Sequence, residues 1–187
     1  MAPHSNPFLR PRVTLIVAAL ATGSAVFAAA MSPSEYSNEK AHLATVYKFD
    51  KSACSDFSGN QKDICQEKAA GEDKVARAEL EYQFTGKPAD RTKAATAKAD
   101  AEFALAKERC DDKSGNPKDV CRQEAKAAHT KALADVKLQS KVADAQMQAS
   151  DDKRDADYKV ATAKCDAFAG DPKTACVNDA KARFGKR

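Results

Sequence analysis

Six cysteines in three pairs of identical spacing are the residues of this 187-residue chain with the most restricted chemistry. The C-x10-C pairs are Cys54 with Cys65, Cys110 with Cys121, and Cys165 with Cys176. Thiols can bind a metal, exchange electrons or form structural disulfides. Zinc, redox and haem motifs use ligands spaced more closely, as in C-x-x-C, and only His42 and His129 follow residue 30. We therefore predict structural disulfides, with no metal site and no cofactor.

The segments between paired cysteines repeat as CSDFSGNQKDIC, CDDKSGNPKDVC and CDAFAGDPKTAC. In each segment a glycine is followed by Asn or Asp, giving the turn residues Gly59 and Asn60, Gly115 and Asn116, and Gly170 and Asp171. Glycine adopts a left-handed backbone conformation at no steric cost just past a helix end. Asn and Asp accept hydrogen bonds from the free N–H groups that begin the next helix. Each unit is therefore predicted to be an αα-hairpin, with Asn or Asp capping its second helix.

Such a turn places the two cysteines of a unit at similar heights on antiparallel helices. The first cysteine lies five residues before the glycine, and the second lies five residues after the capping residue. Alanine-rich helices can approach to about 8 Å, which allows the Cα separation of roughly 5–6 Å that a disulfide requires. We predict pairing within each unit. The chain-entropy model assigns each loop about 2.5–3 kcal/mol.

The composition is typical of long solvated helices. About a fifth of the residues are alanine, 31% are charged and 6% are aromatic, and tryptophan is absent. Alanine forms helices well but buries little surface. This composition excludes an all-β fold, a Rossmann-type enzyme and a multi-span membrane protein. We expect an all-α fold of three disulfide-clipped αα-hairpin repeats in an elongated helical array.

The predicted hairpins comprise residues 31–84, 89–148 and 149–187. We expect helices near residues 35–56, 61–83, 90–112, 117–148, 151–167 and 172–184. Phe84 to Asp90, with the sequence FTGKPAD, is predicted to be a linker. No comparable Gly or Pro lies between the second and third units, where Ser150 could cap a new helix. A continuous helix of roughly 50 residues, about 75 Å long, is the alternative.

An aromatic residue precedes each first cysteine by seven positions: Tyr47, Phe103 and Tyr158. With alanines at helical spacing, these residues predict the core of each hairpin rather than a ligand site. Asp50 takes the place of an alanine in the first unit, which predicts a looser hairpin there. His129 is expected to face solvent.

Residues 1–30 have the pattern of an export signal. Arg10 and Arg12 precede an apolar run that ends in VFAAA, and the small residues permit cleavage after Ala28 or Ala30. An uncleaved anchor is the alternative, because the run from Val13 to residue 30 is just long enough to span a bilayer. Either way residues 31–187 are expected outside the cytoplasm, in the periplasm or tethered to the inner membrane.

The charged residues predict solvated helix faces. Four clustered acids, Asp151, Asp152, Asp155 and Asp157, are interleaved with Lys153 and Arg154. This mixture favours a solvated surface over a metal-ion or small-ligand site. Removing residues 1–30 lowers the net charge of +4 by two, since they contain two arginines and no acid. Without a continuous basic track we expect no nucleic-acid binding.

The repeated C-x10-C units, with G-N-x-K-D before the second cysteine in two of them, resemble small exported proteins of Gram-negative bacteria of unknown function. Proteins of this kind are often labelled TolA-like or cell envelope biogenesis proteins, because their helices are rich in Ala, Lys, Asp and Glu. TolA-type proteins have an N-terminal anchor, a helical stalk and a separate C-terminal domain. The chain ends eleven residues after Cys176, so no such domain is expected here.

No nucleophile is paired with a base in the sequence, so we expect no enzymatic activity. The function that we predict is that of an exported periplasmic structural or interaction protein. Its partner would be an envelope protein or a cell-wall component, and the membrane would be a partner only if residues 1–30 are retained. The alternatives are a membrane-anchored TolA-like spacer and a periplasmic module that binds small ligands or metal ions.

Overall fold

The computed structural model describes residues 31–187, so the predicted export segment, residues 1–30, lies outside the described residues. The described part of the chain is all-α, as expected. Its elements are α1 (Pro33–Ala53), the short 3-10 helix η1 (Cys54–Asp56), α2 (Gly59–Thr85), α3 (Pro88–Cys110), α4 (Gly115–Cys165) and α5 (Gly170–Phe184).

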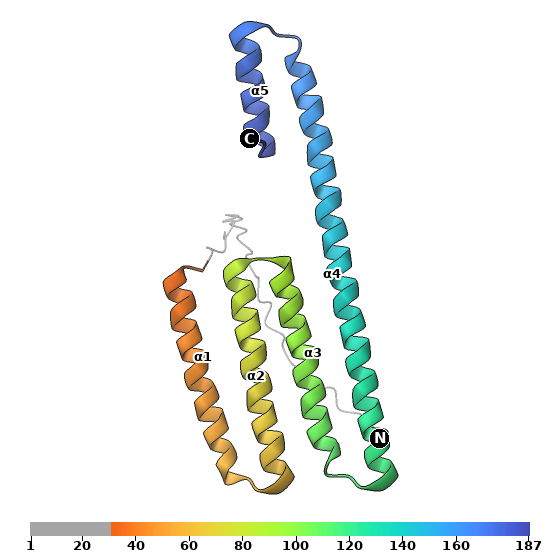
Figure 1. Cartoon of the computed structure of the whole chain (residues 1–187). Coiled ribbons are helices and arrows are strands. Elements are labelled where there is room, and N and C mark those ends of the chain that lie inside the picture. Colours follow the sequence, from red (N-terminus) through yellow and green to blue (C-terminus); the bar gives the residue numbers. More distant parts are fainter. Residues whose placement is uncertain (1–30) are drawn as a thin grey trace, which may run out of the picture.

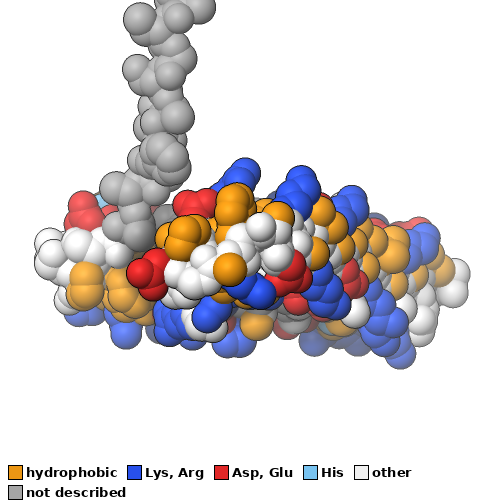
Figure 2. Space-filling view, turned by 90° about the horizontal axis from the view of Figure 1, so that it is seen from above, with side chains coloured by type: hydrophobic (Ala, Val, Ile, Leu, Met, Phe, Trp, Pro, Cys, Tyr) orange, Lys and Arg blue, Asp and Glu red, His pale blue; other side chains and the backbone are white. Residues whose placement is uncertain are grey.

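The helices form a single layer rather than a bundle. Helices α1, α2, α3 and the first part of α4 lie side by side, each antiparallel to the next (Figure 1). Helix α5 packs against the far part of α4, on the same side of α4 as α3. Among the described helices, only those adjacent in the chain contact one another. Seen along the helix axes, the molecule is a thin slab (Figure 2).

The three predicted disulfides are confirmed. Cys54–Cys65, Cys110–Cys121 and Cys165–Cys176 join consecutive helices, with Cα separations of 5.5, 5.6 and 5.7 Å. The first cysteine of each pair is at most 1% exposed. The first two bridges lie at one end of the layer, and the third lies at the opposite end of α4 (Figure 1).

The left-handed conformation predicted for the turn glycines is confirmed, because Gly59, Gly115 and Gly170 have φ angles of +56°, +57° and +62°, but they do not directly follow the first helix. The capping part is wrong. The second helix of each unit begins at the glycine itself, and extended residues, Ser58, Ser114 and Ala169, precede it without a side-chain cap. The first helix already ends near its cysteine, so several residues precede the glycine in the turn.

The side chains of Asn60, Asn116 and Asp171 therefore do not cap the start of the second helix of their units. The amide of Asn60 instead donates to the Glu108 carbonyl oxygen at 2.9 Å and to Asp112 Oδ1 at 2.7 Å. Asn60 thus ties the first disulfide turn to the second.

Helix α4 is continuous over 51 residues, so the predicted break at Ser150 and the separate helices near 117–148 and 151–167 are wrong. The alternative of one long helix is confirmed. No Gly or Pro occurs between Pro117 and Cys165, and a serine inside a helix costs only a few tenths of a kcal/mol. The expected boundary at residues 148 and 149 thus falls within a helix.

The linker between the first two hairpins is shorter than predicted, because only Gly86 and Lys87 separate α2 from α3. Gly86 ends α2 with a φ of +64°, and Pro88 begins α3. This tight turn brings α2 directly against α3. A Cβ atom on Gly71 of α2 would lie 2.9 Å from the Cβ of Ala101 on α3. The first two hairpins therefore pack against each other in one continuous layer, an arrangement that the sequence did not predict.

The buried core is thin. Besides the cysteines, the buried apolar residues are Leu80 and five alanines, Ala69, Ala94, Ala99, Ala125 and Ala180. Helix α1 buries no residue, and the looser first hairpin expected from Asp50 stays a prediction. Close approach of small residues and three covalent bridges thus hold the layer.

Replacing Gly71→Ala tests the close approach of α2 to α3. In an ordinary helix interior this change stabilises by about 1 kcal/mol. Here the added methyl overlaps Ala101, so we expect destabilisation of about 1–3 kcal/mol in urea unfolding monitored by circular dichroism.

The matched control adds Ala101→Gly to Gly71→Ala, which removes the overlap and should recover part of the lost stability. A single Gly71→Ala variant more stable than the parent would contradict this packing.

Candidate functional site

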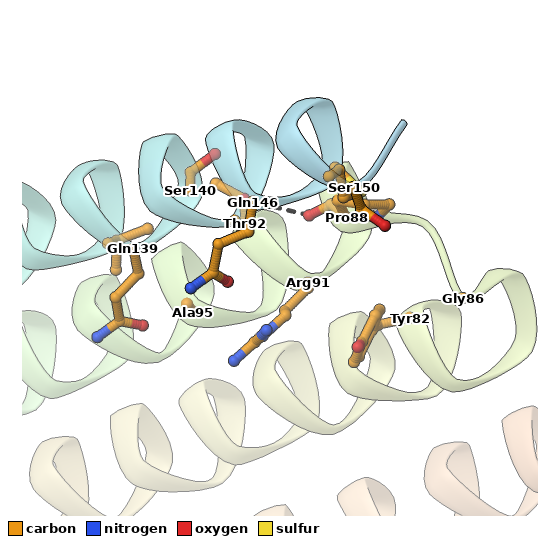
Figure 3. A pocket seen from close by; sticks show the side chains of 13 residues that line it. Tyr82, Gly86, Pro88, Arg91, Thr92, Ala95, Gln139, Ser140, Gln146 and Ser150 are labelled. Carbon is orange, nitrogen blue, oxygen red and sulfur yellow. Dashed lines mark hydrogen bonds between the residues drawn. The ribbon is translucent and has the colours of Figure 1, made fainter. Parts of the chain in front are cut away.

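A groove of about 370 Å³ lies where the α2–α3 turn meets the middle of α4. Tyr82 and Arg91 line it from α2 and α3, and Gln139, Gln146 and Met147 line it from α4 (Figure 3). The groove combines one guanidinium, several amides and hydroxyls, and apolar side chains. It can bind a partner's polar groups through hydrogen bonds.

The groove exists because α4 extends beyond its neighbours. Pro88 begins α3 at the groove, whereas α4 continues through Ala143, Met147 and Ser150. Helix α5 covers only the far end of α4 (Figure 1). Helix α4 thus forms one wall of the groove, and all but one of its lining residues precede Ser150.

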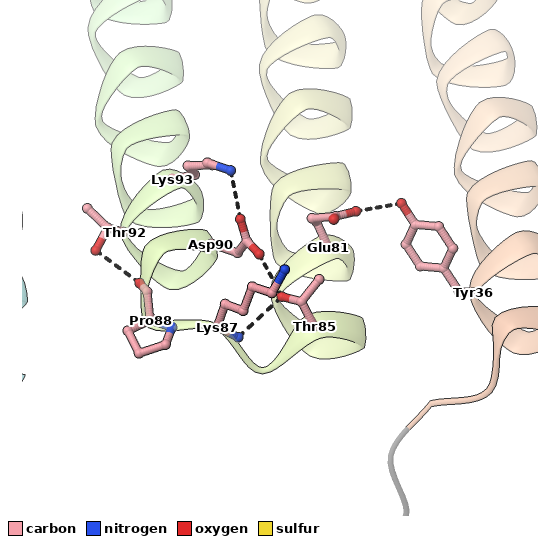
Figure 4. Close-up of polar contacts among 8 residues, drawn as sticks. All are labelled: Tyr36, Glu81, Thr85, Lys87, Pro88, Asp90, Thr92 and Lys93. Carbon is pink, nitrogen blue, oxygen red and sulfur yellow. Dashed lines mark hydrogen bonds and ion pairs between the residues drawn. The ribbon is translucent and has the colours of Figure 1, made fainter. Parts of the chain in front are cut away.

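A polar network holds the α2–α3 turn beside this groove (Figure 4). Asp90 is only 5% exposed; it accepts from Thr85 Oγ1 at 2.7 Å and from Lys93 Nζ at 2.8 Å. The hydrogen bond from Lys93, followed by that from Thr85, holds the pKa of the Asp90 carboxyl below its usual value. A buried charge needs such partners, so this carboxylate fixes the start of α3 against the end of α2.

Tyr36 ties α1 to the same end of the layer. Its ring stacks on Phe84 at a centroid distance of 4.4 Å, and its hydroxyl donates to Glu81 Oε2 at 2.6 Å. The bond to Glu81 raises the pKa of the Tyr36 hydroxyl. Sequence reasoning missed this contact because neither Tyr36 nor Phe84 belongs to the repeated pattern.

A lysine lies two residues after the Asn or Asp of each turn, and in the second and third units it pairs with an aspartate. Asp111, directly after Cys110, pairs with Lys118 at 3.1 Å and with Arg122 at 2.7 Å. Asp166 pairs with Lys173 at 2.9 Å in the third unit. Lys118, and then Arg122, lower the pKa of Asp111. In the first unit a serine occupies the equivalent position, so no such pair can form.

The aromatic stripe packs between the helices of its hairpins, as predicted for Phe103 and Tyr158. Each meets a ring eight residues after the second cysteine: Phe103 stacks on His129 at 4.5 Å, and Tyr158 meets Phe184 edge-on at 6.2 Å. The position in the first unit is Asp73, so Tyr47 has no such ring opposite it.

The prediction that His129 faces solvent is wrong. Its side chain is 19% exposed, stacks on Phe103 and lies 2.7 Å from Asp100 Oδ1. The sequence does carry a signal for this role, because His129 occupies the same position in the second unit as Phe184 in the third.

The acidic cluster on α4 is interleaved with cations. Asp151 pairs with Arg154, and Asp155 pairs with Lys186, which lowers the Asp155 pKa. Within residues 31–187 no group of three or more His, Cys, Asp or Glu side chains is arranged to hold a metal ion. The six cysteines all form disulfides, as predicted.

Across the described helices, none is both long and apolar enough to cross a bilayer. No known family model matches the sequence, and no curated protein or solved structure is significantly similar to it.

Replacing Asp90→Asn tests the buried carboxylate at the α2–α3 turn. Because folding lowers the pKa of Asp90, its charge stabilises the fold above the ordinary value of 3.8, and this contribution is lost as the pH falls. We expect the variant to be less stable at neutral pH. The decline in unfolding free energy between about pH 5 and pH 2.5 should also be shallower than in the parent.

Asp119→Asn serves as the control, since Asp119 is exposed and makes no ion pair in the described part of the chain. Urea unfolding across this pH range should leave its acid profile like that of the parent. An unchanged profile for Asp90→Asn would contradict the assigned role.

Proposed function

We propose that this protein is an exported, non-enzymatic structural or interaction protein of the bacterial periplasm, and that its partner is an envelope protein or a cell-wall component. The observation that carries the proposal is the single layer. Because each described helix contacts only its neighbours in the chain, no described helix covers either face of the layer. A fold that buries so little leaves most of its surface for contact rather than for a core.

The disulfides support an exported location. Three bridges within 187 residues, with no free cysteine in the described part, are typical of an oxidising compartment. The periplasm is the compartment that matches the signal pattern of residues 1–30.

The charge distribution favours a protein partner or a polymer of mixed polarity. In Figure 2, Lys and Arg side chains lie mainly along the two long edges of the slab, with Asp and Glu side chains among them and apolar side chains between. A nucleic acid would require a continuous basic surface.

Cell fractionation with crosslinking tests the role. A photo-crosslinking residue at Gln139, in the groove, should give a discrete adduct with an envelope component in intact cells. The same residue at exposed Lys40, on α1 and away from the groove, is the control and should give less of that adduct.

Osmotic shock should release the protein with its disulfides intact. Retention of the protein in the inner membrane would identify the anchored form. A protein found in the cytoplasm with free thiols would contradict the proposal.

A further inference from the structure

Helix α4 joins two helices that the repeat would otherwise place side by side. Its first part is the second helix of the second unit, and its last part is the first helix of the third unit. The corresponding helices of the first two units, α2 and α3, are separated by a tight turn and pack against each other. Because α4 is continuous, that contact between units has no counterpart among residues 31–187.

The repeat identifies the surfaces that such a contact would use. Gly71, six residues after the second cysteine of its unit, faces Ala101, nine residues before the next first cysteine. The equivalent positions on α4 are Ala127 and Ala156, both exposed. They are separated by about eight helical turns, so they lie on one face of α4.

This face carries apolar residues along the whole helix. Spaced mainly by three, four or seven positions, they are Val120, Ala127, Ala134, Leu138, Val142, Ala145, Ala149, Ala156, Val160 and Ala163, and all are exposed. The four larger side chains are well exposed: Val120 47%, Leu138 61%, Val142 46% and Val160 56%. We call this row the outer stripe.

The outer stripe points away from the layer. The inner side of α4 carries His129, which stacks on Phe103 of α3, and Tyr158, which meets Phe184 of α5. Ala127 and Val160 are each two residues from one of these, which places them about 200° around the helix. Figure 1 shows α3 and α5 on one side of α4 and no described helix on the other.

We propose that the outer stripe binds the outer stripe of a second copy of this chain, in antiparallel orientation. The register follows from the α2–α3 contact: Ala127 meets Ala156 of the second copy, as Gly71 meets Ala101. The same register places Leu138 opposite Ala145 of the second copy, and Val142 lies next to the two-fold axis. The interface is closed, because each half of α4 supplies the surface that the other half needs.

The charged residues that interrupt the stripe support this register. It places Lys131 opposite Asp152 of the second copy and Glu124 opposite Lys159 of the second copy, and symmetry forms each pair twice. All four side chains are exposed, and none makes an ion pair within the described part of the chain. An antiparallel pair thus matches opposite charges at both polar positions, whereas a parallel, in-register pair would bring like charges together.

This inference deepens the proposed interaction role by naming one partner, and it rests on that role only in assigning a use to the surface. The two can fail separately. Crosslinking from Gln139 reports on the groove on the inner side of α4, whereas self-association uses the outer stripe.

Sedimentation equilibrium of the purified oxidised protein tests the dimer. At concentrations of about 100 μM, corresponding to a micromolar Kd or tighter, we expect a mass twice that of the single chain. Leu138→Glu should abolish the dimer, and Met147→Glu is the matched control. Met147 is an exposed apolar residue of the same helix, 45% exposed, but it lines the inner groove. Circular dichroism should show both variants to be equally helical.

Charge reversal tests the register. Lys131→Glu creates two like-charge contacts in the dimer and should raise Kd by roughly tenfold. Adding Asp152→Lys to Lys131→Glu restores opposite charges and should return Kd to near the parent value. A protein that stays at the mass of one chain, forms species heavier than a dimer, or gains nothing from the second reversal would overturn the proposal.

Discussion

The fold depends on covalent closure of its hairpins, because the helices have little else to hold them. A single layer buries each helix only along narrow strips, and most buried positions are alanines. At about 25 cal/mol per Å² of apolar surface, such small side chains contribute little each. Disulfide loops of about 2.5–3 kcal/mol are large beside a typical domain stability of about 5–15 kcal/mol. The ion pairs that follow the first cysteine of the second and third units lie at the same turns, so they add to an already fixed geometry.

The local structure could be predicted from the sequence because the same pattern of cysteines, glycines and aromatic residues occurs in three units. The cysteine pairs, the left-handed glycines and the aromatic positions follow from spacing and from the conformational needs of each residue. The role of Asn60 could not be predicted in this way. Its amide bonds to Glu108 and Asp112 across two hairpins, and a contact between units leaves no periodic signal within either one.

The arrangement of the units was also beyond the sequence pattern. The prediction of a seven-residue linker, FTGKPAD, overlooked that a left-handed Gly86 and a proline at the start of α3 need only two residues to reverse the chain. Conversely, Ser150 with its following aspartates has the residue types of a helix start, yet nothing there prevents α4 from continuing. Capping residues permit a helix to begin, whereas a helix ends where a left-handed residue or a proline interrupts its backbone hydrogen bonds. The groove lies where the α2–α3 turn meets α4, so it depends on this arrangement of the units and could not be predicted either.

The disulfides, rather than an apolar core, provide most of the stability of the layer. Urea unfolding of the oxidised protein and of the fully reduced protein, both followed by circular dichroism, measures their share. The chain-entropy model gives about 8 kcal/mol for three loops of this length. The reduced protein should therefore be largely unfolded already at low urea concentrations and show no cooperative transition. Equal unfolding midpoints for the oxidised and the reduced protein would contradict the claim.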